Sequence, residues 1–144
     1  MKPRLFLDNN IIVDFLGERD PFYLPAAKVI ALADRKKVEL CAASLSFATT
    51  FYLLTKYESA EAVKEKFRNF LILCTASSVD DAIVKKALAS GFKDFEDAMQ
   101  YYSALSVKAD VIITRNAKDF KESHLPVMSA EEYMLLYKSQ HDSK

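Results

Sequence analysis

Short apolar runs alternate with longer amphipathic stretches along the whole chain. The runs that have the length and continuous apolar character of buried strands are residues 4–7, 38–43, 71–75, 110–114 and 126–128. Between them, apolar side chains recur every three or four positions and predict helices over residues 9–16, 22–36, 47–57, 59–70, 78–88 and 94–107, and from 129 onward. Strands that alternate with helices form parallel sheets. We therefore predict one Rossmann-like α/β domain of three layers, with helices flanking a parallel sheet of four to five strands.

Polar residues at the predicted helix starts indicate how several helices are capped. Ser44 or Ser46 is expected to cap the helix at 47–57. Serine followed three positions later by an acid resembles a capping box, and this pattern occurs at Ser78 and again at Ser129. In the helix at 94–107, the spacing predicts an inner stripe of Phe95, Ala98, Met99, Tyr102 and Leu105.

Length and composition fit one compact domain. The chain has 144 residues, of which 51% are hydrophobic and two are glycine. We expect the domain to span residues 1–139 and residues 140–144 to fray. Lysine plus arginine and aspartate plus glutamate both number 20, so a nucleic-acid partner would need a local basic patch.

The two cysteines and the lack of long apolar runs indicate where in the cell the protein is expected. Cys41 and Cys74 lie in or beside apolar runs without metal-ligand spacing, which is typical of reduced core thiols. No apolar run approaches the roughly 20 residues that a membrane span requires, and the start of the chain does not resemble a signal peptide. We expect a cytoplasmic protein that is not held in a membrane.

Polar side chains follow the predicted strands at positions suited to chemistry. Asp8 ends the first apolar run, Asp94 and Asp97 open a helix, and Asn116 and Asp119 follow the run at 110–114. Taken singly, each is better explained by helix capping than by catalysis, because such side chains accept hydrogen bonds from the first turn. However, ligands of parallel α/β sheets bind beyond the carboxyl ends of the strands, where these groups can converge. Clustered carboxylates favour Mg²⁺ or Mn²⁺, which prefer oxygen ligands.

Three segments resemble, in order and spacing, the motifs of the PIN-domain family. They are Leu7-Asp8-Asn9-Asn10, Asp94-Phe95-Glu96-Asp97-Ala98, and Ile113-Thr114-Arg115-Asn116-Ala117-Lys118-Asp119-Phe120. The resemblance covers nearly the whole chain. It implies a small Rossmann-like domain and, as in many members, a Mg²⁺- or Mn²⁺-dependent ribonuclease, including the VapC-like toxins of bacterial toxin–antitoxin pairs. RNA and a cognate antitoxin are the partners that it implies. Apolar helix faces that stay exposed could serve either an antitoxin or a homodimer.

By position, the resemblance matches Asp8 to the first acid of the family, Asn10 to the polar residue two places on, and Asp97 to the third acid. Two positions depart from the family pattern. Thr49 stands where a glutamate is usual, and Asn116 stands where the fourth acid follows the Thr-Arg pair. Because both substitutions remove a negative charge, we expect the cation to bind weakly.

The site expected from this comparison has three parts. The metal ligands are Asp8, Asp97 and Asp94; the catalytic set is Asp8, Asp97, Asn116 and Asp119; and the supporting residues are Asn10, Thr49, Thr114, Arg115 and Glu96. Asp94, Glu96 or Asp119 is expected to compensate for the missing charges. Arg115 is expected to contact phosphates, together with Lys93, Lys118 and Lys121.

Two other functions remain open from the sequence. The missing glutamate and Asn116 also fit a PIN-like module that binds RNA or a protein without turnover. A phosphoryl-accepting receiver-like or small phosphatase domain also gathers acids at strand ends. The first strand, however, lacks the paired acids that such domains carry at its tip.

Overall fold

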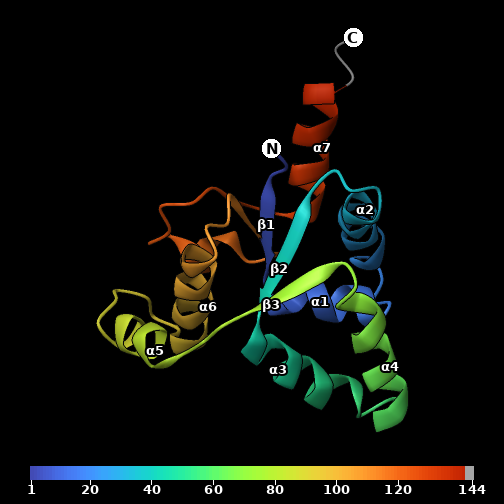
Figure 1. The fold of residues 1–144 in the computed structure, drawn as a ribbon, viewed down its shortest axis with the longest axis horizontal. Coiled ribbons are helices and arrows are strands. Elements are labelled where there is room, and N and C mark those ends of the chain that lie inside the picture. The colour runs from blue at the N-terminus through green and yellow to red at the C-terminus, as the bar shows by residue number, and fades with distance from the viewer. Residues whose placement is uncertain (142–144) are drawn as a thin grey trace.

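The computed structural model describes residues 1–141, and its strands form one parallel five-stranded sheet in the order β3-β2-β1-β4-β5 (Figure 1). The strands are β1 (Arg4–Leu7), β2 (Glu39–Ala43), β3 (Cys74–Ser77), β4 (Val111–Ile113) and β5 (Val127–Met128). The register pairs Phe6 with Cys41 of β2 and with Ile112 of β4. The parallel α/β sheet predicted from the sequence is confirmed.

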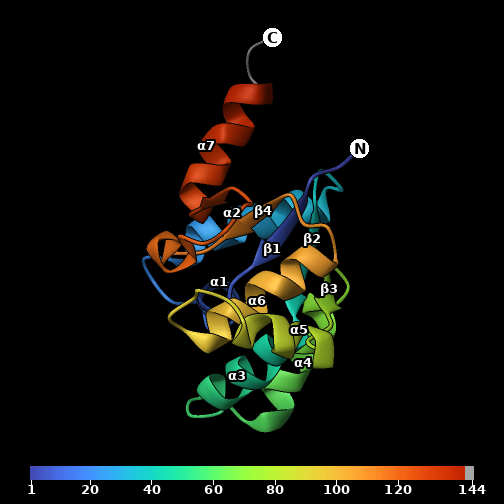
Figure 2. The same ribbon diagram turned by 90° about the vertical axis from the view of Figure 1, so that its left-hand side faces the viewer.

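Helices cover both faces of this sheet. They are α1 (Asn9–Leu16), α2 (Tyr23–Asp34), α3 (Ser44–Leu54), α4 (Ala60–Phe70), α5 (Asp81–Leu88), α6 (Phe95–Ser106) and α7 (Ala130–His141), with a short 3₁₀ helix η1 (Ala117–Phe120) after β4. In Figure 1, α5 and α6 lie on one side of the sheet, and α1, α2 and α4 lie on the other. Figure 2 shows α7 projecting at the end of the molecule opposite α3.

Alternating side chains of the strands build a separate core on each face. Leu5 and Leu7 of β1 are fully buried in the core beneath α1, α2, α4 and α7. Phe6 points the other way and packs with Tyr101 and Ala104 of α6. With this period of two, Asp8, which follows Leu7 in an extended conformation, is directed to the same face as Phe6.

The third strand begins later than the hydrophobic pattern predicts. Residues 71–73 belong to the turn that closes α4, where the Leu71 N–H donates to the Phe67 carbonyl and the Ile72 N–H donates to the Asn69 carbonyl. Leu71 is 46% exposed and Ile72 is 78% exposed. The strand prediction at 71–75 is therefore displaced, because an apolar run was read as buried when only its last residues enter the sheet.

Two of the predicted caps are wrong. Helix α3 begins at Ser44 itself, and its N-cap residue Ala43 contributes no side-chain hydrogen bond, while Ser46 lies on the buried face. Asp80, and not Ser78, caps α5, by accepting a hydrogen bond from the Ile83 N–H. An aspartate nearer the first turn takes the capping position in preference to a serine two residues earlier.

The capping box at the last helix is confirmed. The Ser129 N–H donates to Glu132 Oε1 at 2.8 Å, and the Glu132 N–H donates to Ser129 Oγ at 3.1 Å. Helix α7 includes Gln140 and His141, the first residues of the segment expected to fray. The remaining residues of that segment, 142–144, lie outside the described residues.

The buried face of α6 differs from the predicted stripe. Phe95 and Leu105 are exposed, and the buried residues are Ala98, Gln100, Tyr101, Ser103 and Ala104. Small side chains on this face let the helix approach the sheet closely, and the Tyr101 hydroxyl accepts a hydrogen bond from the His124 N–H. The inner-stripe prediction is confirmed for Ala98 and wrong for Phe95 and Leu105, because the polar residues Gln100 and Ser103 share the buried side.

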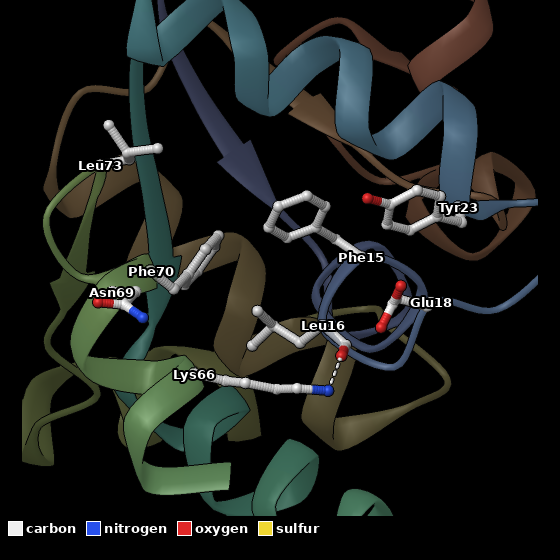
Figure 3. A pocket seen from close by; sticks show the side chains of 8 residues that line it. All are labelled: Phe15, Leu16, Glu18, Tyr23, Lys66, Asn69, Phe70 and Leu73. Atoms are coloured by element: carbon white, nitrogen blue, oxygen red, sulfur yellow. Dashed lines mark hydrogen bonds between the residues drawn. The ribbon is translucent and has the colours of Figure 1, made fainter. Parts of the chain in front are cut away.

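A pocket of about 300 Å³ lies between α1, α2 and α4, away from the predicted acidic residues (Figure 3). The Phe15 and Tyr23 rings stack at its wall, and Lys66 donates hydrogen bonds to the Leu16 carbonyl and to Glu58. Within residues 1–141, no helix is both long enough and apolar enough to cross a membrane.

Candidate active site

Asp8 lies at the carboxyl end of β1 and is almost completely buried. Its Oδ1 accepts a 2.7 Å hydrogen bond from the Asn9 N–H, so Asp8 caps α1. Its Oδ2 accepts a 2.6 Å bond from the Thr114 hydroxyl and a 3.3 Å bond from the Asn10 side-chain amide. Capping therefore uses only one of the two carboxylate oxygens, and the other is held from β4 and α1.

Thr114 organises the segment that follows β4. Besides donating to Asp8, its hydroxyl accepts a 3.0 Å hydrogen bond from the Asn116 N–H and a 3.4 Å bond from the Asn10 amide. The Asn10 carbonyl oxygen accepts a bond from the Arg115 N–H at 3.3 Å. Because β1 and β4 are neighbours in the sheet, these bonds fix the end of β4 against the start of α1.

The first turn of α6 brings further carboxylates to Asp8. Asp94 caps the helix by accepting a 3.0 Å hydrogen bond from the Asp97 N–H. Glu96 accepts a hydrogen bond from the side-chain amide of Asn9. Half-buried Asp97 lies among the other acids, and loss of hydration followed by the charges of Asp8, Asp94, Asp119 and Glu96 raises its pKa to about 7.

Two other carboxyl groups are perturbed by the same cluster. Burial raises the pKa of Glu96, and the charges of Asp94 and Asp8 raise it further. Burial also raises the pKa of Asp8, against the opposing effect of its hydrogen bonds. The structure thus brings together Asp8, Asp94, Glu96, Asp97 and Asp119, which come from β1, α6 and η1.

A pocket of about 220 Å³ opens beside these acids. It is lined by Gly91, Phe92, Lys93, Asp94, Asp97, Lys118, Asp119, Lys121 and Glu122. Across residues 1–141, none of its three lysines lies within 4 Å of a carboxylate oxygen. Acidic groups and unpaired cationic groups therefore line the same opening. The sequence reasoning missed Glu122, whose position two residues beyond η1 carries no motif.

The two positions that depart from the family pattern make only local contacts. Thr49 is half-buried in α3, and its hydroxyl donates to the Leu45 carbonyl at 3.4 Å. Asn116 is exposed, and its side chain does not cap η1. Asn116 is connected to Asp8 only indirectly: its backbone N–H donates to the Thr114 hydroxyl, which in turn donates to Asp8.

Arg115 does not join the acidic cluster. Its guanidinium donates to both carboxylate oxygens of Asp14, at 2.6 and 3.2 Å, and it lies over the Phe22 ring at 3.9 Å. Asp14 is fully buried in α1. The expected phosphate contact of Arg115 therefore competes with this ion pair. A charged residue on an otherwise apolar helix was the sequence signal for Asp14.

Gln100 was also missed, because glutamine in a helix ordinarily indicates an exposed position. It lies on α6 one turn after Asp97, is fully buried, and has an amide that favours the ionised form of Asp8 and so lowers its pKa. Its position among the buried residues of α6 became visible only in the fold.

The donor set fits a hard divalent cation. All the groups gathered around Asp97 offer carboxylate oxygen, and their mutual repulsion is what a bound cation relieves. In the described part of the chain, no three His, Cys, Asp or Glu side chains lie close enough to form a metal site by themselves. This arrangement suits Mg²⁺, which commonly binds one or two carboxylates and completes its shell with water and substrate phosphate.

Comparison with known proteins decides the family. A model described as the PIN domain matches residues 4–118. The chain belongs to the PIN-domain family. This PIN domain is 27% identical over 135 residues to a protein named Ribonuclease VapC1 from Aquifex aeolicus, with 90% of this chain and 92% of that protein covered.

Solved structures show the same fold. A toxin–antitoxin complex from Klebsiella pneumoniae is similar with a TM-score of 0.65 and 19% identity, covering 88% of this chain and 97% of that one. VapBC2 from Rickettsia felis, bound to a DNA fragment from its promoter, is similar with a TM-score of 0.63 and 18% identity over the same shares of the two chains. The PIN-domain resemblance found in the sequence is confirmed.

Proposed function

We propose that this PIN domain is a Mg²⁺- or Mn²⁺-dependent endoribonuclease and the toxin of a toxin–antitoxin pair. The observation that carries the proposal is the meeting of Asp8 with the acids of α6 and η1, which raises the pKa of Asp97 to about 7. Acids held this close at the carboxyl end of a parallel sheet favour metal-assisted chemistry over helix capping alone. The named ribonuclease relative supports RNA as the substrate.

In this proposal, Asp8 and Asp97 hold the cation. Asp94, the third ligand expected from the sequence, caps α6 and adds its negative charge to the cluster. When bound, such an ion orients the scissile phosphate and lowers the pKa of an attacking water molecule. Asp119 belongs to the same acidic cluster, and we assign to it and to Asn116 the role of orienting water through their side-chain oxygens. Their exposure leaves them accessible to substrate.

The protein contributes orientation and charge around the cation. Thr114 and Asn10 hold Oδ2 of Asp8 through hydrogen bonds, and the Asn9 N–H holds Oδ1. The lysines of the acidic pocket, Lys93, Lys118 and Lys121, contact phosphates on either side of the scissile bond. A local cluster of this kind supports RNA binding by a chain whose overall net charge is zero.

Two features of the site favour a second function, which is binding without catalysis. The usual glutamate is absent at Thr49, and within residues 1–141 the acids do not form a three-ligand cage. A PIN domain with this site could bind RNA or a protein without turnover. The nuclease is favoured by the hydrogen bonds from Asn9, Asn10 and Thr114, which keep the Asp8 carboxylate in one orientation.

The experiment is cleavage of single-stranded RNA by purified protein with and without Mn²⁺. We expect Mn²⁺-dependent cleavage by the wild type, and loss of cleavage with Asp8→Asn, which keeps the shape of the side chain and removes its charge. Lys36→Ala, a change outside the acidic pocket, serves as the matched control. Micromolar RNA binding without Mn²⁺-dependent cleavage would support the second function instead.

The toxin role is supported by the toxin–antitoxin complexes among the similar structures. It predicts that expression of the wild type, but not of Asp8→Asn, arrests bacterial growth. Co-expression of its cognate antitoxin should restore growth. Growth arrest that is equal for both variants would contradict the toxin mechanism while leaving cleavage in vitro to be judged separately.

A further inference from the structure

Gln100 is a fully buried amide that lacks a hydrogen bond at either end. Neither Nε2 nor Oε1 has a partner of normal geometry among the described residues. A buried polar group without a partner costs about 1–3 kcal/mol, and native proteins satisfy nearly all such groups. Its side chain is therefore expected to have a partner that completes these bonds when the site is assembled.

The position of Gln100 identifies that partner. It lies three residues after Asp97, and so on the same side of α6 one turn further along. The amide lies close enough to the Asp8 carboxylate to lower its pKa, although the two do not form a bond of normal geometry. The carboxylate of Asp8 is thus an acceptor that lies near the unpartnered Gln100 amide.

Other unpartnered oxygens occur on the helices that begin beside this point. They are Asn9 Oδ1 on α1, and Ser46 Oγ and Thr50 Oγ1 on α3. Helices α1 and α3 pack against each other, and Figure 1 shows them beginning at the ends of β1 and β2. Buried polar groups of this kind are typically bridged by water, which can also complete the bonds of the Gln100 carbonyl.

We propose that Gln100 is a positioning residue that donates a hydrogen bond from its amide to Asp8. The inference deepens the proposed nuclease function and rests on it for its catalytic consequence. The donors to Asp8 that have normal geometry belong to Asn9, Asn10 and Thr114. Gln100 adds a donor from α6, the helix that carries Asp97, and so it fixes the spacing between the two acids proposed to share a cation.

The hydrogen bond is tested first without any cleavage assay. In metal-free wild-type protein, the two side-chain N–H signals of Gln100 are followed by ¹⁵N NMR and assigned by their absence in Gln100→Met. We expect both signals to shift and to exchange faster with water in Asp8→Ala. Signals that are identical in wild type and Asp8→Ala would overturn the proposal.

The catalytic consequence is tested with Gln100→Met, which keeps the length of the side chain and removes the amide. We expect kcat for RNA to fall about 10- to 100-fold, because the acids lose their alignment. KM should change less than twofold, because the lysines proposed to bind phosphate remain. Mn²⁺ affinity measured without RNA should fall as well. A merely unpartnered amide predicts the opposite, namely a higher melting temperature with unchanged kcat and Mn²⁺ affinity.

Ser103→Ala is the matched control. Ser103 is equally buried on α6, but its hydroxyl bonds to Ser77 and to the Ser78 carbonyl. This change should lower the melting temperature and leave kcat intact. If the wild type does not cleave RNA, the nuclease function fails, and the NMR result still decides whether Gln100 binds Asp8. The NMR test also stands if Gln100→Met does not fold, with Gln100→Glu then providing the assignment.

Discussion

The Thr114 hydroxyl donates a 2.6 Å hydrogen bond to Oδ2 of Asp8, across 106 residues of sequence. Thr114 is fully buried and Asp8 nearly so, so solvent cannot replace the bond. Neighbouring strands of the sheet are thereby joined at the point where both end.

Removing this hydroxyl should destabilise the protein and the site together. Thr114→Val keeps the side-chain volume but removes the 2.6 Å hydrogen bond to Oδ2 of Asp8 and the acceptor of the Asn116 N–H. A hydrogen bond to a charged group contributes about 1.5–3 kcal/mol, so we expect the free energy of unfolding to fall by about 2 kcal/mol in urea titrations at pH 7. Thr114→Ser should retain most of the stability. Equal stability of Thr114→Val and the wild type would contradict the bond.

The acidic cluster makes the metal-free protein sensitive to pH. The pKa of Asp97 is about 7 in the folded protein against 3.8 for an ordinary aspartate, so the folded state binds more protons between these values. Stability should therefore fall as pH rises through this window. Asp97→Asn removes the titrating group, and its melting temperature in EDTA should exceed that of the wild type increasingly from pH 5 to pH 7.5.

Divalent cations provide the control for that experiment. Mg²⁺ should raise the melting temperature of the wild type at pH 7.5 and raise that of Asp97→Asn less, because the substitution removes one proposed ligand. Glu131→Gln, a change in the first turn of α7, should keep the pH dependence of the wild type. Parallel pH curves for the wild type and Asp97→Asn would show that this carboxyl group does not titrate as inferred.

Arg115 should act on stability more than on RNA. Arg115→Leu leaves the fully buried Asp14 carboxylate unpaired, and we expect a loss of about 3 kcal/mol in the free energy of unfolding. Asp14→Leu combined with Arg115→Leu should recover much of this loss, because no buried charge remains. Urea titrations of the single and double variants measure the coupling.

RNA-binding measurements should distinguish the role of Arg115 from that of the three lysines beside the acids, Lys93, Lys118 and Lys121. Lys118→Ala should weaken RNA binding and reduce its dependence on salt concentration, while leaving the melting temperature nearly unchanged. If Arg115→Leu reduced the salt dependence as much as Lys118→Ala does, Arg115 would have to leave Asp14 for a phosphate when RNA binds.

Restoring the usual glutamate should strengthen cation binding. Thr49→Glu replaces a hydroxyl that bonds only to the Leu45 carbonyl, so little is lost from the fold. An added carboxylate in a site short of charge should lower the Mn²⁺ dissociation constant about tenfold, measured by calorimetry. Thr55→Glu, at the other end of α3, is the control. No gain from Thr49→Glu would mean that this position does not face the acids.

Most of the fold could be read from the sequence because its signals are local. The apolar runs at β1, β2 and β4 have the right length, and the Ser129 capping box uses groups only three residues apart. Leu71 and Ile72 show the limit of this reading, since an apolar run does not reveal where a helix stops turning. The buried face of α6 was missed because Gln100 and Ser103 are polar and yet face the core.

The site was only partly readable for the same reason. Asp8, Asp94, Asp97 and Asp119 stand at element ends, where a pattern marks them, and the fold brings them together. Arg115 and Asp14 pair across 101 residues, and no local pattern links them. Roles within the cluster depend on distances between α6, β1 and η1, which are properties of the packed layers.

The bond between Asp8 and Thr114 also sets when the site can exist during synthesis. A growing chain that ends before residue 111 contains Asp8 and all the acids of α6, but it lacks β4, which must insert beside β1 to bring Thr114 and Asp119 into place. Domains generally fold as units, and β1 lies between β2 and β4, so the sheet around β1 is incomplete until β4 has been made. The complete cluster of acids is thus among the last parts of the domain to assemble, and a chain that is released early keeps Asp97 without Asp119 beside it.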